Sequence, residues 1–188
     1  MILQALYEYY QRKPEIHAPV GYEIEEIDFL IVIDKYGKLI DLQNLIKNKR
    51  GHPYLIPKAI VRTGQKILPN LLWDSFEYIT GLSKDPKRSE KAKEYNKAFI
   101  SKLNGLPNNI KENESVLPLL KFYNSDFQTQ LISHPNFDEC RKRNGWITFK
   151  IDGDSEIIAA KEIIKKYQAE QFLSGVYEEE DIKNAKEG

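Results

Sequence analysis

The sequence predicts an α+β domain in which several helices pack on a small, mainly antiparallel sheet. Residues 29–33 form a compact apolar run, mostly β-branched, that is typical of a buried strand. Residues 34–37, D-K-Y-G, have the composition of a tight turn, so residues 39–42 are expected to return as the second strand of a hairpin. Helical spacing then dominates residues 72–134. Because strands and helices do not alternate regularly, a doubly wound fold is not expected.

Further strands and one short helix are expected around this hairpin. Apolar residues at helical spacing from Leu3 to Tyr10 predict an amphipathic helix that stops before Pro14. Residues 54–61 form a weaker strand, which Pro57 restricts to the edge of a sheet. Residues 146–151 alternate between apolar and polar side chains and predict a half-buried strand.

Helices are expected through most of the second half of the chain. Ser89 is a suitable N-cap for the longest of them, and Gly105 is a suitable stop. Residues 104–114 contain Pro107 and several asparagines and are the most linker-like stretch. The expected helical segments are residues 73–82, 89–103, 115–133 (as two helices) and 155–168.

These elements group into one domain, residues 1–175, followed by an acidic tail, residues 176–188. A chain of 188 residues is long enough for one good core. Within the domain we expect a hairpin-containing sheet over about residues 22–62, a helical part over about 72–134, and a strand-helix unit over about 146–168.

The composition indicates a cytoplasmic protein. Hydrophobic residues make up 41% and charged residues 30%, as in ordinary globular proteins. The longest apolar run, residues 29–33, is far shorter than the roughly 20 residues that a membrane span needs. The N-terminus lacks the basic start of a signal peptide, and the single cysteine, Cys140, excludes an internal disulfide.

The formal net charge is zero, but the charges are unevenly distributed. Residues 1–34 and 151–188 are acidic, whereas residues 35–70 carry eight bases and one acid. A basic block in a neutral protein suggests a local site for a polyanion. The alternative is a solvated loop rich in lysine. The bases of the block are Lys35, Lys38, Lys47, Lys49, Arg50, Lys58, Arg62 and Lys66.

The most informative segment is residues 58–81, K-A-I-V-R-T-G-Q-K-I-L-P-N-L-L-W-D-S-F-E-Y-I-T-G. It sets bases, hydroxyls and amides on an apolar background. Bases neutralise DNA phosphates, and hydroxyl and amide groups can reach base edges in a groove. The alternative is that Asn70 only turns the backbone after Pro69, while Trp73 fills the core.

The segment resembles the signature R-T-x-G-x-x-P-N-F-L-W-D-N-x-x-Y-V-x-G of the large-subunit family of subtype I-C (Dvulg) CRISPR systems. Leu71 stands where Phe is usual, and Ser75 where Asn is usual. Residues 1–10, 31–38 and 147–154 are also similar to the start of this family. The matching residues of the signature are Arg62, Thr63, Pro69, Asn70, Leu72, Trp73, Asp74, Tyr78 and Gly81.

The resemblance implies the N-terminal part of a longer protein, the large subunit of a crRNA-guided surveillance complex (Cascade) in antiviral defence. The implied partners are double-stranded target DNA at the protospacer-adjacent motif (PAM), the crRNA-bearing Cascade subunits, and a helicase-nuclease recruited in trans. We therefore expect phosphate contacts from Lys47, Lys49, Arg50, Lys58, Arg62 and Lys66, motif reading by Asn70, Thr63 or Gln65, and structural support from Trp73 and Tyr78.

We expect no catalytic residue, metal or cofactor. Asp28 and Asp34 flank a strand, and paired carboxylates can hold Mg²⁺ for a nuclease. However, Asp34 lies in a turn, where Asp is favoured on conformational grounds. The glycine patterns of phosphate-binding and dinucleotide-binding loops are missing from the sequence. Two alternatives to DNA binding stay open: a scaffold that docks on the other subunits without reading DNA, and, less favoured, a metal-dependent nuclease.

Overall fold

A computed structural model of the chain describes residues 18–187, and the side chains of residues 18–175. The helix expected at residues 3–10 therefore lies outside the described residues. The strands are β1 (Tyr22–Ile27), β2 (Phe29–Ile33), β3 (Leu39–Asn44), β4 (His52–Pro57), β5 (Trp73–Ser75) and β6 (Trp146–Ile151). The helices are α2 (Phe76–Thr80), η2 (Pro86–Arg88), α3 (Ser89–Asn104), α4 (Asn108–Lys111), α5 (Leu117–Tyr123), α6 (Phe127–Ile132), α7 (Phe137–Arg143), η3 (Ile158–Ala160) and α8 (Glu162–Glu187).

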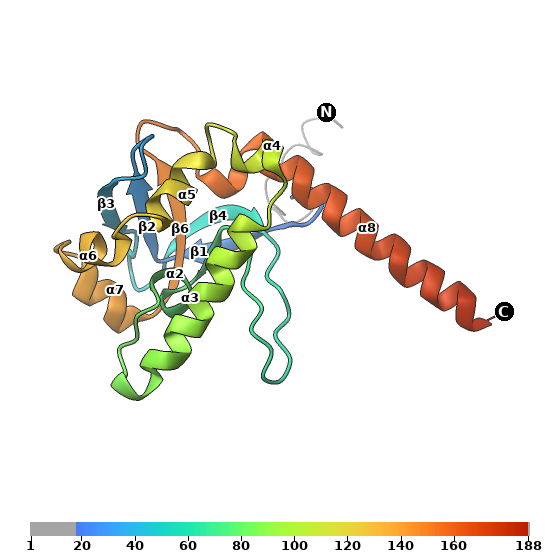
Figure 1. Cartoon of the computed structure of the whole chain (residues 1–188), viewed down its shortest axis with the longest axis horizontal. Coiled ribbons are helices and arrows are strands. Elements are labelled where there is room, and N and C mark those ends of the chain that lie inside the picture. Colours follow the sequence, from blue (N-terminus) through green and yellow to red (C-terminus); the bar gives the residue numbers. More distant parts are fainter. Residues whose placement is uncertain (1–17, 188) are drawn as a thin grey trace, which may run out of the picture.

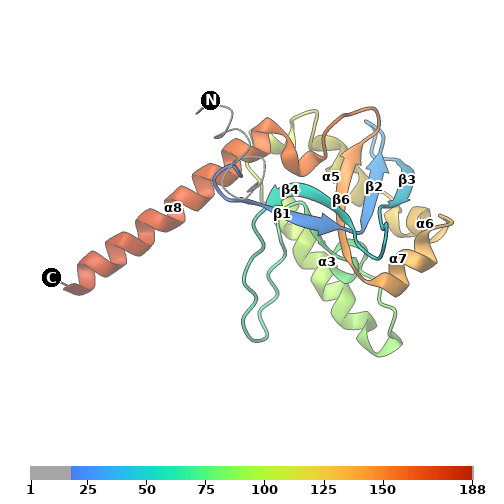
Figure 2. The ribbon, with the colours of Figure 1, turned by 180° about the vertical axis from the view of Figure 1, so that it is seen from behind.

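The strands form two sheets, which confirms the expected α+β class. The larger sheet has the order β3-β2-β6-β5, and β1 pairs with β4 in a separate ribbon. The pairing of β2 with β6 is parallel, and the other pairings are antiparallel. Helices cover one face of the larger sheet (Figure 1), and the β1–β4 ribbon lies against its other face (Figure 2).

Strand β2 lies at the centre of the core, and all five of its residues are buried. Because β2 is covered on both faces, the side chains on both of its faces must be apolar, which explains its continuous apolar run. The expected hairpin with β3 is present. Asp34 Oδ1 accepts the backbone N–H groups of Tyr36 and Lys38 at 2.8 and 2.9 Å. Gly37 has φ +83°, and a Cβ there would lie 2.5 Å from the backbone nitrogen of Phe122.

The strand expected at residues 54–61 is shorter and begins earlier than the sequence predicts. It is β4, which ends at Pro57. It pairs with β1 over its whole length, with Tyr22 opposite Pro57 and Ile27 opposite His52. Proline lacks an N–H for a second ladder, so the ribbon position suits Pro57. The chain then leaves the sheet as a long loop.

The helix expected at residues 73–82 is only partly correct. Trp73–Ser75 is strand β5, with Trp73 opposite Thr148 of β6, and helix α2 begins at Phe76. Tertiary pairing with a buried strand overrides the helical spacing of the apolar side chains. Helix α2 ends at Thr80, and Gly81 caps it in the left-handed conformation with φ +71°.

The longest expected helix is α3, with Ala92, Phe99 and Leu103 on its buried face. It ends before Gly105, as predicted, but Ser89 is its first residue and not an N-cap. The capping side chain of this region belongs to Asp85, which accepts the N–H of Lys87 in η2.

The linker-like stretch, residues 104–114, is part of the core and contains α4. Leu106 and Ile110 are each 3% exposed. The two helices expected over residues 115–133 are α5 and α6. The sequence does not predict helix α7, which ends at Arg143 and is capped by Asn144 with φ +49°.

The last helix differs most from its expected bounds of residues 155–168. Strand β6 has the expected bounds, residues 146–151. After it the chain passes through η3 into α8. Helix α8 begins at Glu162 and its backbone continues to Glu187. It leaves the body of the molecule as a single long rod (Figure 1).

Candidate nucleic-acid interface: a projecting loop and its root

Residues 58–70 form a loop that stands out from the body between α3 and α8 (Figures 1 and 2). We call it the projecting loop. It connects the end of β4 to the start of β5. Val61 is 81% exposed, and a Cβ on Gly64 would meet no atom within 4 Å. The tip of the loop is therefore surrounded by solvent.

The side chains at the tip are polar and available. Thr63, Gln65 and Lys66 are exposed. Gly64 between them has φ +66°, which allows the chain to reverse direction. In the described part of the chain, none of these three side chains takes part in a hydrogen bond or an ion pair. A hydroxyl, an amide and an ammonium group are thus presented together, as contacts to DNA require.

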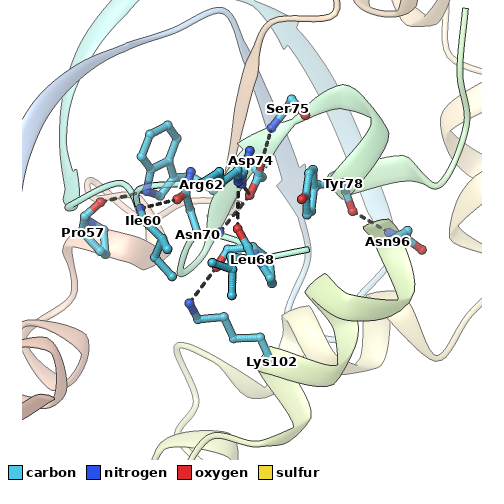
Figure 3. A network of polar contacts seen from close by, with 12 residues as sticks. Pro57, Ile60, Arg62, Leu68, Asn70, Asp74, Ser75, Tyr78, Asn96 and Lys102 are labelled. Carbon is cyan, nitrogen blue, oxygen red and sulfur yellow. Dashed lines mark hydrogen bonds and ion pairs between the residues drawn. The ribbon is translucent and has the colours of Figure 1, made fainter. Parts of the chain in front are cut away.

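Asn70, which the sequence suggested as a motif reader, is turned inward at the root of the loop (Figure 3). It is 2% exposed. Its Oδ1 accepts the N–H of Ile60 at 2.9 Å, and its backbone N–H donates to Asp74 Oδ2 at 2.8 Å. An amide in this position cannot reach a base edge. The expectation of readout by Asn70 is corrected: its hydrogen bond joins the two arms of the loop.

Arg62, expected to contact phosphate, is also part of the root. Its Nε donates to Leu68 O across the loop at 2.8 Å, and its guanidinium pairs with Asp74. The guanidinium lies 4.3 Å from the centre of the Tyr78 ring. The side chain is 29% exposed, and its charge is offset by a carboxylate. Its main contacts are therefore within the protein. Because Asp74 offsets its positive charge, Arg62 attracts a phosphate only weakly.

Asp74 is the centre of this arrangement, which we call the root network: Arg62, Asn70, Asp74 and Lys102. The Asp74 side chain is fully buried. Burial raises the pKa of Asp74 above its usual value, although the N–H of Asn70 and the guanidinium of Arg62 oppose the rise. Lys102 of α3 donates to Pro69 O at 2.7 Å (Figure 3), and burial lowers its pKa to about 8.

Trp73 and Tyr78, the expected supports, lie beneath the loop. Trp73 Nε1 donates to Pro57 O at 2.8 Å, and its ring meets that of Trp146 edge-on at 5.1 Å. Tyr78 is 5% exposed and stacks on Tyr95 of α3 with ring centres 4.4 Å apart. Both rings fix the loop's root to the body.

The second group of expected bases forms a separate turn at residues 47–50, which we call the basic turn. Asn48 and Lys49 have positive φ, and Lys47 bridges to Arg50. The basic turn precedes the His52 end of β4, whereas the projecting loop leaves the other end. At roughly 3.3 Å per residue, the strand separates them by about 16–20 Å. Arg50 also pairs with Glu26, so the structure does not join the two basic groups into one patch.

The root network is the part that sequence reasoning missed. Lys102 is 33 positions from Pro69 and lies on a helix whose exposed face carries several other lysines, so its spacing gives no signal. Asp74 belongs to the quoted signature, but its burial is visible only in three dimensions. Most of that signature forms the root, and of its matching residues only Thr63 is at the tip.

The carboxylates considered for a nuclease are far from one another. Asp28 precedes β2 and Asp34 follows it, so the two lie at opposite ends of the strand. Asp28 is 6% exposed and faces Arg143 at 3.4 Å. Asp34 binds the backbone of its own turn. Within residues 18–175, no three His, Cys, Asp or Glu side chains cluster as metal ligands would.

Fold and site together define an α+β domain that presents a polar, cationic loop on a buried, ion-paired root. The family model of CRISPR-associated protein (Cas_Csd1) matches residues 6–187, so the chain belongs to this family. It is thus a CRISPR Cascade component with a role in antiviral defence. A search of curated proteins found no match. Along residues 18–187, no helix combines the length and apolarity that crossing a membrane takes.

Proposed function

We propose that this chain is the N-terminal, DNA-binding and PAM-sensing region of the large subunit of a type I-C surveillance complex. The observation that carries the proposal is the projecting loop, whose tip presents Thr63, Gln65 and Lys66 to solvent. Family membership gives the context, since Cascade binds DNA under the direction of a guide RNA. In such systems base pairing reads the target and the protein reads a short motif.

The division between tip and root supports this proposal physically. Motif reading requires donors and acceptors held in place before the DNA arrives, because ordering a loop on binding costs affinity. Two hydrogen bonds close the loop at its root: the N–H of Ile60 donates to Asn70 Oδ1, and Arg62 Nε donates to Leu68 O. Lys66 then adds attraction for phosphate, while Thr63 and Gln65 supply the groups that can discriminate bases.

The test uses the assembled complex and two duplexes that differ only in the PAM. Gln65→Ala and Thr63→Ala should each weaken binding of the PAM duplex by about tenfold, with a smaller loss on the PAM-free duplex. Lys66→Ala should weaken both duplexes equally and lower the salt slope by about one. Lys35→Ala, a lysine in the β2–β3 turn, is the matched control and should change neither.

Asn70→Ala should behave differently from the tip variants. Because its amide joins the arms of the loop, its loss should weaken binding of both duplexes to a similar extent. Equal losses on both duplexes for Gln65→Ala and Thr63→Ala together would rule out readout by the loop. A loss confined to the PAM duplex in Asn70→Ala would show that the amide turns outward on DNA.

A scaffold role is a second candidate, favoured by helix α8. Phe172 and Leu173 on this rod are 41% and 47% exposed, which suits docking on another Cascade subunit. Charged substitutions there should reduce assembly without altering PAM preference.

We further propose that the chain has no catalytic activity of its own. Cleavage of DNA or RNA by the chain alone with Mg²⁺ or Mn²⁺, lost in Asp28→Asn, would contradict this.

A further inference from the structure

A small cavity lies at the root of the projecting loop, on the side facing α8. It has a volume of about 230 Å³, below the roughly 300–1,000 Å³ of most pockets for drug-sized ligands. The loop root supplies Lys58, Ile60 and Leu71, and α3 supplies Lys102. Helix α8 closes it with side chains one turn apart, from Tyr167 and Gln168 to Gln171.

The lining of this cavity is rich in hydrogen-bond donors and contains no carboxylate. Lys58 and Lys102, which carry ammonium groups, line it together with Tyr167, which has a hydroxyl, and Gln171, which has an amide. The hollow at the start of α8 is different, because Glu114, Glu156 and Glu162 line it beside Lys161 and Lys166. Of these two hollows, only the cavity at the loop root therefore has two cations without a carboxylate beside them.

The two ammonium groups are incompletely satisfied by the protein. Lys102 has three N–H donors and gives one to Pro69 O. Lys58 lies 5.2 Å from the centre of the Phe172 ring. In residues 18–175, neither lysine has a carboxylate within ion-pair distance. Lys102 is also largely withdrawn from water, which disfavours an unpaired ammonium group, as the lowering of its pKa to about 8 reflects.

We propose that this cavity binds one phosphate group, held by Lys58, Lys102, Tyr167 and Gln171. Lysine acts as a point charge on phosphate, and several donors from three elements suit an oxyanion with several acceptor oxygens. Ile60 and Leu71 add apolar surface to the lining, and a less polar surrounding strengthens the attraction between unlike charges. The phosphate comes from a polynucleotide backbone or from free phosphate. The proposal stands independently of base readout at the loop tip.

The first experiment titrates the full chain with inorganic phosphate at constant ionic strength and pH 7, following backbone and side-chain amides by NMR. Saturable shifts are expected at Leu71 and at the side-chain amides of Gln168 and Gln171. No saturation, or shifts scattered over lysines outside the cavity, would overturn the proposal. Adding a thymidine oligonucleotide identifies the source: competition with phosphate indicates backbone binding, and its absence indicates free phosphate.

Variants make the assignment specific. Lys58→Gln and Gln171→Glu change exposed side chains and should each weaken phosphate binding by about tenfold. Lys97→Gln removes an exposed lysine of α3 that does not line the cavity and should leave binding unchanged. Equal affinity in all three variants would overturn the assignment. None of them alters the loop tip, so a phosphate result and a PAM-duplex result can fail separately.

Discussion

Arg62 is a charged side chain of the projecting loop whose main role is to stabilise the root of the loop. It bonds Leu68 O, pairs with Asp74 and lies over Tyr78. Each partner is on a different part of the loop root, so Arg62 joins them. Removing it would leave the Asp74 carboxylate buried without its counter-charge, which costs more than the loss of an exposed ion pair.

We predict that Arg62→Ala lowers the free energy of unfolding by about 3 kcal/mol at pH 7.5. The loss should shrink at pH 5. Without Arg62, the folded pKa of Asp74 rises further above its unfolded value, so the folded state takes up a proton that the unfolded state has released. Stability of the variant therefore falls as pH rises. Urea unfolding at both pH values measures this, with Lys66→Ala as a near-neutral control; equal deficits would contradict it.

Lys102 titrates in the opposite sense. Burial lowers its folded pKa to about 8, against 10.5 ordinarily. Between these values the unfolded state binds a proton that the folded state has lost, so this group makes the protein more stable as pH rises from 8 to 10.5. Below pH 8 the cost of burying the charge is present in full.

The prediction is tested by comparing the protein with Lys102→Met at pH 7.5 and 9.5. The unfolding free energy of the unchanged protein relative to the variant should increase with pH. Burial raises the pKa of Cys140 to about 12, which makes the free energy of unfolding fall with pH equally in both proteins. The difference between the two proteins therefore reports on Lys102 alone. A difference independent of pH would show that Lys102 is not desolvated.

At the scale of elements, the outer edge of β3 is closed by side chains. Gln130 Oε1 accepts the N–H of Leu39 at 2.9 Å. His134 Nε2 lies 3.3 Å from the N–H of Leu42, and Asn136 Nδ2 donates to Leu42 O at 2.8 Å. An open edge would offer these groups to a strand of another chain. Helix α6 and the segment that joins it to α7 thus protect the edge of the sheet.

We predict that Asn136→Ala opens this edge locally. Leu42 O would lose its partner, and the Leu42 amide should exchange with deuterium about tenfold faster, the effect of roughly 1.4 kcal/mol of local opening. Thr129→Ala, an exposed change on α6, is the control and should leave that amide unchanged. Unchanged exchange in Asn136→Ala would mean that the edge is held by the other two side chains.

The turn into β6 depends on a missing side chain. A Cβ on Gly145 would lie 1.8 Å from Asp28 Oδ2. We predict that Gly145→Ala lowers the melting temperature strongly, since a buried carboxylate would have to move. Gly64→Ala at the loop tip meets no neighbour and should cost only the strain of its positive φ, about 1–2 kcal/mol. A smaller effect at Gly145 than at Gly64 would contradict this close approach.

At the scale of the whole molecule, two basic regions lie at opposite ends of β4. We predict that they act on DNA independently. In the assembled complex, the binding losses of Lys47→Ala with Lys49→Ala and of Lys66→Ala should add within about 0.5 kcal/mol. Filter binding or interferometry at several salt concentrations measures this. A markedly non-additive loss would mean that one phosphate run crosses both regions.

Sequence patterns predicted the buried core well and the site only in part. The run at residues 29–33 and the turn closed by Gly37 each follow from local chemistry, and each is present. By contrast, the apolar spacing of residues 73–82 is compatible with helix or strand. Only pairing with β6 decided that Trp73 lies in a strand.

By itself, the sequence determined the class of fold, the central hairpin and the presence of a basic, polar segment at residues 58–70. The tertiary structure decided which of those polar groups face outward. Arg62 turns inward because its guanidinium pairs with Asp74, which β5 pairing buries. The Asn70 side chain turns inward because its Oδ1 accepts the N–H of Ile60, while Thr63 and Gln65 remain in solvent. The solvent exposure of a side chain depends on neighbours that are distant in the chain, such as Lys102. The spacing of residues within a short segment does not indicate these neighbours.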